Sequence, residues 1–491
     1  MGMYEPIKGG DDDFDTRNSS SSMMIDNKDV ESAIQISQSS SSSVSNTNAA
    51  AIIVNLNKQK QVQEKDPLVL SSSNSNNHHR HNQQQPPQRQ PRLVSLDVFR
   101  GLTVAVMSYL IQLMILVDDL GGLVPAINHS PWNGLTLADF VMPFFLFIVG
   151  VALALAYKKL SCRISATKKA TLQALKLLLV GLVLQGGFFH GINNLTYGVD
   201  IQQMRLMGVL QRIAIAYIVA ALCEIWLKGE DDIGTKLFAL TKYRFHWVVV
   251  LMLSVIYLSL LYGLYVPDWE YQISAETSSS APEIFSVKCG TRGNTGPACN
   301  AVGMIDRKVL GIQHLYLKPV YARTKQCSIN SPDNGPLPPD APSWCQAPFD
   351  PEGLLSSVMA IITCFVGLHY GHIIVHLKDH WDRIVHWTII SSCLVVVGFG
   401  LSFFGMHINK ALYTFSYMCV TGGAAGLLFT AIYVMVDVCG FRRVNMVFEW
   451  MGKHALMIYV LVACNVLPIM LHGFYWKQPQ NNILSLIGIG K

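Results

Sequence analysis

Charged residues are scarce in this sequence: they make up 14% of its 491 residues, against 51% for hydrophobic residues. The mean hydropathy is +0.32. An ordinary soluble domain of this length carries more charge, so the soluble globular class is excluded. The composition indicates an integral membrane protein, whose partner is the lipid bilayer and for which no nucleic-acid partner is expected.

Three sequence features are also absent. No cleavable signal peptide precedes the apolar runs, so the first span is expected to act as the insertion signal. Neither a Gly-rich phosphate loop nor a CxxC pair occurs. Residues 1–91 are rich in Ser, Asn, Gln and His, a composition that cannot bury enough apolar surface to fold. They are predicted to form a disordered cytosolic tail.

The apolar runs predict an all-α polytopic membrane protein. Crossing about 30 Å of hydrocarbon takes about 20 helical residues, and about nine runs are long enough. They form a predicted helix bundle over residues 92–475, with a short tail at 476–491. The predicted spans are residues 102–118, 138–157, 170–189, 207–227, 246–266, 354–376, 384–404, 413–436 and 452–471.

The charges between spans predict the orientation. With a cytosolic N-terminus, every basic cluster in a short loop lies on the cytosolic side, as the positive-inside rule requires. Residues 267–353 then form a long luminal loop with an even number of cysteines, which favours two disulfides in an oxidising lumen. A zinc site is the competing interpretation, and the pairing is open. The cysteines are Cys289, Cys299, Cys327 and Cys345.

One polar loop between two spans carries a titratable histidine. The stretch NHSPWNGLTLAD places His129, Trp132 and Asn133 at a membrane boundary, with the carboxylates Asp118 and Asp119 a short distance upstream. A histidine near a carboxylate is suited to general-base catalysis, with the carboxylate as its orienting partner. The alternative interpretation is a solvated histidine beside an interfacial tryptophan.

Polar residues also interrupt the spans. Asp97 and Arg100, one helical turn apart, form either an interfacial ion pair or an anion-binding group at the cytosolic mouth. Arg212 lies inside a span, where an arginine must be paired or face water, so it is expected to point into the bundle toward Asp118, Asp139 or Glu449. The candidate substrate- or CoA-binding residues are Arg100, Trp132, Asp139, Arg205, Gln211 and Arg212.

Histidines recur on one face near the end of the sixth predicted span. The stripe consists of His369, His372, His376 and His380. Such spacing is compatible with haem or metal ligation, but a two-haem carrier needs facing histidines from several helices. We interpret the stripe as interfacial, and no metal is predicted.

Five sequence blocks together resemble the heparan-α-glucosaminide N-acetyltransferase family. They are SLDVFRGLTVAVM, NHSPWNGLTLADFVMPFFLFIVGVALA, LMGVLQRIAIAYIVAA, FDPEGLLSSVMAIITCFVGLHYG and NKALYTFSYMCVTGG, in the family's order. The resemblance implies a transmembrane acyltransferase that takes acetyl-CoA from the cytosol as co-substrate. It further implies acetylation of a terminal glucosamine on a glycan at the luminal face of a lysosomal or vacuolar membrane, by a homodimer.

The resemblance also implies residue roles. His129 matches the family's catalytic histidine, which acts either as acetyl acceptor or as general base on the acceptor amine. Asp118 stands where the animal enzyme has a catalytic asparagine. An ionised carboxylate cannot donate to an oxyanion, so Asp118 is expected to be protonated, to orient His129, or to be replaced in this role by Asn133.

The chain departs from the family in two other respects. It is expected to be a form without the N-terminal luminal domain, and to end, at Lys491, before one or two spans that relatives have. Two other functions stay open: a proton-coupled transporter that uses Asp118, His129 and Arg212 as a relay, and a catalytically inactive membrane scaffold. No internal repeat supports the transporter. The acceptor is not identified by these residues.

Overall fold

The computed structural model contains one compact unit within residues 90–491. The predicted tail, Asp118 and residues 476–491 lie outside the residues that the structure describes. The described residues are 95–103, 129–158, 162–186, 188–189, 197–198, 204–228, 242–273, 283–316, 319–332, 335–441, 443 and 445–463.

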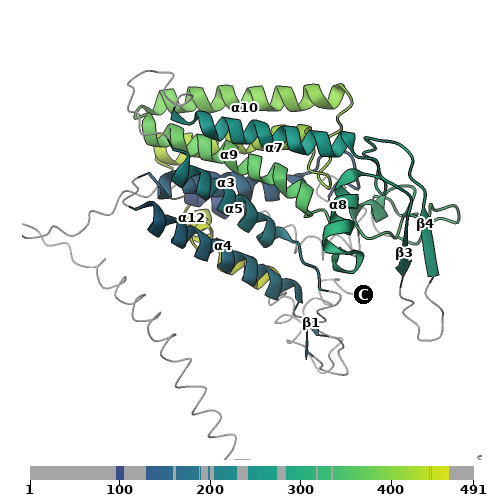
Figure 1. Ribbon diagram of the computed structural model, residues 1–491. Coiled ribbons are helices and arrows are strands. Elements are labelled where there is room, and N and C mark those ends of the chain that lie inside the picture. Colours follow the sequence, from purple (N-terminus) through teal and green to yellow (C-terminus); the bar gives the residue numbers. More distant parts are fainter. Residues whose placement is uncertain are drawn as a thin grey trace, which may run out of the picture. The chain divides into compact units, whose positions relative to one another are not determined.

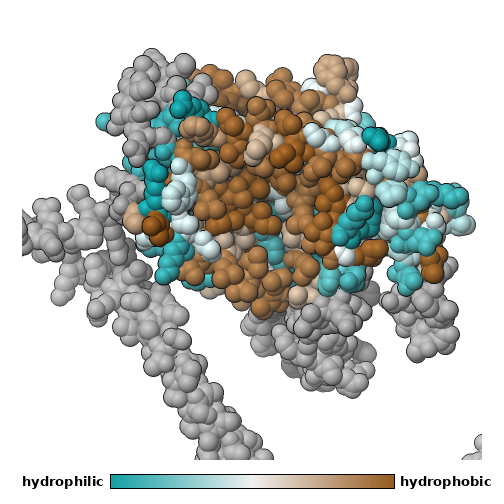
Figure 2. Space-filling view, viewed as in Figure 1, coloured by the Kyte–Doolittle hydropathy of each residue, from teal (hydrophilic) through white to brown (hydrophobic). Residues whose placement is uncertain are grey.

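Six of the predicted spans are confirmed as helices long and apolar enough to cross a membrane. The first begins with a 3₁₀ turn, η1 (Leu137–Phe140), and the last ends in a π-helical turn, η4 (Val434–Val438). Figure 2 shows the hydrophobic belt over these helices, with hydrophilic residues toward both ends. The helices are α3 (Val141–Ala156), α5 (Val209–Trp226), α7 (Arg244–Gly263), α9 (Leu354–His376), α10 (His380–Phe403) and α11 (Phe415–Tyr433).

The other three predicted spans are not confirmed as spans. Residues 170–189 fall largely in helix α4 (Arg163–Gly186), which is not among the helices long and apolar enough to cross a membrane. Residues 452–471 are described only in part, as α12 (Met446–Lys453) and α13 (Ala455–Ala463). Most of residues 102–118 lie outside the described residues. A count of nine spans therefore stays a prediction.

Helix α3 packs against α9 with the two backbones in close approach. A Cβ on Gly150 would lie 2.0 Å from the carbonyl oxygen of Cys364, and a Cβ on Gly367 would lie 2.0 Å from that of Phe147. Glycine lets helix backbones in a bundle approach this closely. The contact fixes α3, and with it the turn η1 that carries Asp139.

The segment between α7 and α9 contains strands, which corrects the all-α prediction. Strands β3 (Trp269–Ile273) and β4 (Glu283–Val287) pair antiparallel, with Tyr271 opposite Phe285. Their alternating aromatic side chains cover a small core of their own. The segment also holds α8 (Ala301–Leu310) and the short turns η2 (Ile312–His314) and η3 (Val320–Arg323). A second pair, β1 (Phe188–Phe189) and β2 (Tyr197–Gly198), joins α4 to α5.

The four loop cysteines form two disulfides, as predicted. Cys289 is bonded to Cys299, and Cys327 to Cys345. This pairing connects the cysteines nearest in sequence and removes the zinc alternative. In Figure 1, α8, β3 and β4 lie at one end of the long helices. We call this the loop end.

We expect Gly367→Val to lower the free energy of unfolding by about 3 kcal/mol, because its side chain overlaps the backbone of α3. Denaturant unfolding in detergent measures the loss. Gly400→Val is the matched control, since a Cβ at Gly400 in α10 meets no atom within 4 Å. Equal losses in the two variants contradict the close contact of α3 and α9.

Non-reducing peptide mapping is expected to recover two cross-linked peptide pairs, one joining Cys289 to Cys299 and the other Cys327 to Cys345. Reduction before digestion should abolish both. Recovery of any crossed pair, such as Cys299 with Cys327, contradicts the loop fold.

Candidate active site

His129 is paired with Asp139 at the loop end. The Nδ1 atom of His129 lies 2.8 Å from Oδ1 of Asp139. The histidine side chain is 29% exposed, whereas the aspartate side chain is fully buried. A reachable imidazole held by a buried carboxylate is the arrangement of a histidine base with its orienting partner. Asp139 was predicted to contact a substrate, whereas in the structure its carboxylate contacts His129.

The local sequence explains why the Asp139 carboxylate is rigid. Thr136 precedes η1, and its backbone N–H and hydroxyl donate to Oδ2 of Asp139 at 3.1 and 2.8 Å. The backbone N–H of Ser130 donates to the same oxygen at 3.3 Å. A threonine before a helical turn and an acid three residues later form a capping box. The carboxylate is thus oriented before any ligand binds.

Lys410 is the third member of this group, and it was not among the residues predicted from the sequence. Its Nζ atom lies 2.8 Å from Nδ1 of His129 and 3.2 Å from Oδ1 of Asp139. The residue belongs to the loop before α11. A lysine in a short loop predicted to be luminal is contrary to the positive-inside rule, and that exception was a signal available in the sequence.

The surroundings of His129 oppose its charged form. Burial lowers its pKa below the usual 6.5, and the Lys410 ammonium lowers it further, against the opposite effect of Asp139. Arg323 of η3 also donates to the backbone carbonyl of His129, at 2.8 Å. The net direction favours a neutral imidazole in mildly acidic solution.

Trp132 and Asn133 hold the loop in place. The Trp132 indole N–H donates to the carbonyl of Thr295 at 3.1 Å, and its ring packs edge-on against Tyr321 and Phe349. Asn133 forms a short backbone bridge with Asn409, whose side-chain amide donates to Oδ1 of Asn133 at 3.2 Å. Trp132 is therefore structural, while the exposed Asn133 lies at the edge of the site.

Arg205 and the residues before α9 form a buried ion network beside the histidine group. Arg205 donates to both oxygens of Asp350, at 2.8 and 2.6 Å, and to Glu352. Although burial opposes its charged form, Asp350 and Glu352 raise the pKa of Arg205. Burial likewise opposes ionisation of Glu352, yet Arg205, Arg212 and Lys410 together lower its pKa. The network and the His129 group thus share one electrostatic environment.

Arg212 points into the bundle, as the cost of an intramembrane arginine predicts. It is 2% exposed. Its Nη2 donates to the carbonyl of Pro351 at 2.5 Å and to the Ser356 hydroxyl, and its guanidinium lies 5.4 Å from the centre of the Tyr413 ring. The predicted pairing with Asp139 or Glu449 is wrong, because the guanidinium donates its hydrogen bonds to Pro351 and Ser356 at the start of α9.

Asp306 of α8 is a further buried acid near this network. One of its carboxylate oxygens accepts from the backbone N–H of Leu354 at 2.8 Å, at the start of α9. The other oxygen has no hydrogen-bond partner among the described residues. Burial raises the pKa of Asp306 to about 7. The acid therefore ties the disulfide loop to α9.

Two predicted site residues lie elsewhere. Arg100 pairs with Asp97 at 3.5 Å, and the same short helix reaches Asp437, at the end of the last span away from the loop end. Gln211 is buried between α4 and α5, where its side-chain amide meets Gln185 at 3.4 Å. The interfacial ion-pair interpretation of Asp97 and Arg100 fits this geometry.

The histidine stripe belongs to a second polar cluster, at the end of the bundle opposite the loop. The buried Glu224 carboxylate accepts from His372 at 2.8 Å and pairs with Lys228 at 3.1 Å. His246 lies 3.4 Å from the same carboxylate. The Tyr243 ring stacks on His372 with centroids 3.6 Å apart. The stripe is thus partly buried, which corrects its purely interfacial interpretation.

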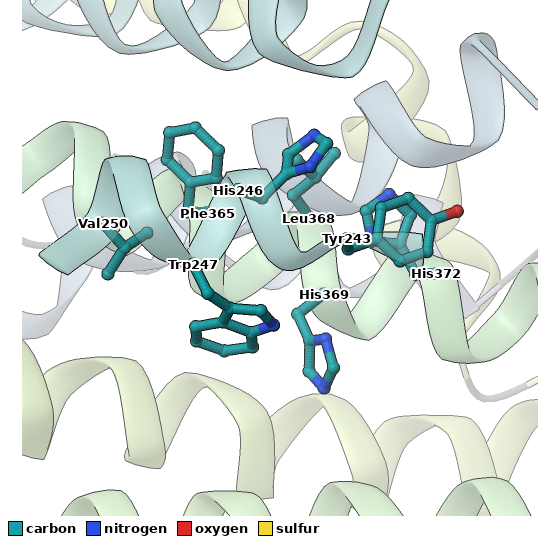
Figure 3. A pocket seen from close by; sticks show the side chains of 8 residues that line it. All are labelled: Tyr243, His246, Trp247, Val250, Phe365, Leu368, His369 and His372. Atoms are coloured by element: carbon teal, nitrogen blue, oxygen red, sulfur yellow. The ribbon is translucent and has the colours of Figure 1, made fainter. Parts of the chain in front are cut away.

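A small open pocket adjoins this second cluster. Figure 3 shows Tyr243 lying over His372, with His246 beside them and Trp247 and His369 on the pocket's other side. Within the described part of the chain, no three His, Cys, Asp or Glu side chains are grouped to hold a metal ion. The prediction that the protein uses no metal stays a prediction.

Comparisons with known proteins agree with the blocks quoted from the sequence. Residues 92–263 match the family model described as heparan-alpha-glucosaminide N-acetyltransferase, catalytic. The chain is 28% identical over 411 residues to the heparan-alpha-glucosaminide N-acetyltransferase of Mus musculus, which covers 79% of this chain and 55% of the mouse protein. It is 27% identical over 416 residues to that of Homo sapiens, covering 80% and 55%.

The chain thus spans about half the length of the curated relatives it matches. The family match includes the loop of His129, the start of α3 with Asp139, and Arg205 and Arg212. Lys410 and the network before α9 lie outside the matched range. These findings confirm the predicted resemblance: the chain is similar to the heparan-alpha-glucosaminide N-acetyltransferases.

Proposed function

We propose that this protein is a transmembrane acetyltransferase that moves an acetyl group from cytosolic acetyl-CoA to an amino sugar of a luminal glycan. The observation that carries the proposal is the pair formed by the accessible His129 and the buried Asp139 at the loop end. The similarity to N-acetyltransferases supports the reaction type. The proposal includes a lysosomal or vacuolar membrane, a cytosolic N-terminus and a homodimer.

In this proposal, Asp139 orients the ring of His129 and stabilises its protonated form. With Nδ1–H donated to Asp139, the Nε2 lone pair becomes the basic group. Nε2 then either takes a proton from the acceptor ammonium or attacks the thioester carbonyl itself. The first route gives direct transfer, and the second gives an acetyl-imidazole.

Both routes end in the same balanced reaction. The amine nitrogen forms a bond to the acetyl carbonyl carbon, the bond to the CoA sulfur breaks, and the thiolate takes up a proton. An amine that enters as ammonium releases one further proton, which His129 receives and passes to solvent. Asn133, at the edge of the site, is the candidate donor to the oxyanion. The alternative predicted from the sequence is that Asp118, in its protonated form, donates to the oxyanion.

In this proposal, the acyl donor approaches His129 through the bundle from the end opposite the loop end. Its phosphates require cations, and Arg100 is placed at that end, paired with Asp97. The loop-end cations Arg205 and Arg212 are each engaged by the segment before α9. Arg100 is likewise paired, with Asp97, so its position at that end is all that makes it the candidate CoA contact. Arg205 and Arg212 shape the acceptor side. The acceptor, a small molecule or a glycan, meets His129.

A proton-coupled transporter is the second candidate, and one observation favours it. Glu224, His246 and His372 form an ionisable cluster inside the spans, remote from His129. Ionisable residues inside a membrane often mark proton or substrate pathways. Uptake of labelled glucosamine into sealed vesicles distinguishes the candidates, because a transporter accumulates the sugar unmodified whereas the acetyltransferase returns it acetylated.

Membranes containing the protein are expected to transfer label from acetyl-CoA to glucosamine, and His129→Ala should lower the rate by about a thousandfold, because it removes the base or nucleophile. His407→Ala, on an exposed histidine near the same end, is the control at matched expression. A variant at His129 that retains full transfer disproves the assignment.

Asp139→Asn should lower the rate of transfer by at least about a hundredfold, because an amide neither selects the productive tautomer nor stabilises an imidazolium. The variant keeps the size of the side chain, so thermal unfolding in detergent should show a folded protein. Folded protein with an unchanged rate shows that His129 works without Asp139.

A further inference from the structure

The Nδ1 atom of His129 has two partners that cannot both be satisfied by one hydrogen. Oδ1 of Asp139 lies at 2.8 Å and only accepts, while the ammonium of Lys410 lies at 2.8 Å and only donates. If Nδ1 carries a hydrogen, it donates to Asp139 and faces the ammonium unfavourably. If Nδ1 is bare, it accepts from Lys410 and faces a carboxylate oxygen. Each protonation state of the ring therefore weakens one contact.

We propose that Lys410 is a positioning residue that competes with Asp139 for Nδ1 of His129 and thereby keeps the imidazole uncharged in acidic solution. This inference rests on the proposed function for its catalytic meaning, but the relation between the two side chains exists without it. In the state in which Asp139 holds Nδ1–H, the basic lone pair lies on Nε2, and the Lys410 ammonium lies 3.5 Å from that atom. In the state in which Lys410 donates to Nδ1, the ring hydrogen lies on Nε2, which then has no lone pair to act as a base.

Lys410 has another anion to turn toward when it leaves Nδ1. Its ammonium already contacts Asp139 at 3.2 Å and is among the cations that lower the pKa of Glu352. Glu352 lies just before α9, within the Arg205 network. A small rotation of the flexible lysine side chain thus exchanges the histidine for carboxylates without leaving the cation unpaired.

The groups around the ring come from separate parts of the fold. Asp139 belongs to η1, Lys410 to the loop before α11, and Arg323 to η3 of the disulfide loop. Burial disfavours the charged ring most, Lys410 and Arg323 add to this effect, and Asp139 favours the charged ring. The effects of removing Lys410 and Asp139 therefore have opposite signs, which makes the competition measurable.

The test follows the neutral fraction of His129 against pH by its reaction with diethyl pyrocarbonate, which reacts with uncharged imidazole but not with its protonated form. Peptide mass spectrometry reads the modified His129 directly, without acetyl-CoA. The full chain is compared with Lys410→Met, Lys410→Arg and Asp139→Asn. We expect Lys410→Met to move the midpoint to higher pH and to lower the modification rate at pH 5 by about tenfold or more. Lys410→Arg retains the charge and should keep the midpoint within a fraction of a pH unit.

Asp139→Asn is expected to move the midpoint to lower pH, because it removes the group that favours the charged ring. A midpoint unchanged in both Lys410→Met and Asp139→Asn overturns the proposal, as does an equal shift in Lys410→Met and Lys410→Arg. A rate lowered evenly at all pH values in Lys410→Met assigns Lys410 a structural role only and also overturns it.

The pH profile of acetyl transfer supplies the second readout. Its acid limb should move to higher pH together with the midpoint of His129 in Lys410→Met and stay in place in Lys410→Arg. If the parent transfers no acetyl group but the modification midpoints move as expected, the proposed function fails and the role of Lys410 stands. If transfer occurs but the modification midpoints do not move, the proposed function stands and the role of Lys410 fails.

Discussion

The complete burial of the Asp139 carboxylate is the constraint on which the loop end depends. A buried carboxylate is costly unless hydrogen bonds and an opposite charge replace its water. Here Thr136, Ser130, His129 and Lys410 supply them. Tyr417 of α11 also donates to the backbone carbonyl of Asp139. Satisfying one side chain therefore fixes the polar loop, the start of α3 and the approach to α11 together.

The apolar interior separates this group from the Glu224 cluster. Arg212 begins α5 at the loop end, and Glu224 lies twelve residues further along the same helix, a distance of about 18 Å. Each polar cluster is built where several helices end and loops supply extra donors. Each of the two ends groups a histidine with a fully buried carboxylate and a lysine, but the histidine of the loop end, His129, has a side chain that is 29% exposed, whereas that of His372 is 4% exposed.

The individual site residues show what sequence patterns convey. His129 was identified because a titratable group on a short loop between spans is unusual, and Arg212 because a membrane requires a partner for it. Its actual partners, the carbonyl of Pro351 and the hydroxyl of Ser356, are ordinary polar groups in a sequence and carry no signal. Lys410 lies 281 residues from His129, so no local spacing connects them. Trp132 resembled a site residue and is a packing residue.

By itself, the sequence determined the membrane class, six of the helices that are long enough to cross, the histidine loop and the set of cysteines that form disulfides. These follow from composition, apolar length and local polarity, which act over one helix or one loop. Only the tertiary structure decided that Asp139 meets His129, that Lys410 joins them, and that β3 and β4 form a hairpin. Those choices depend on which segments meet in space, because burial and hydrogen bonding act between side chains remote in sequence.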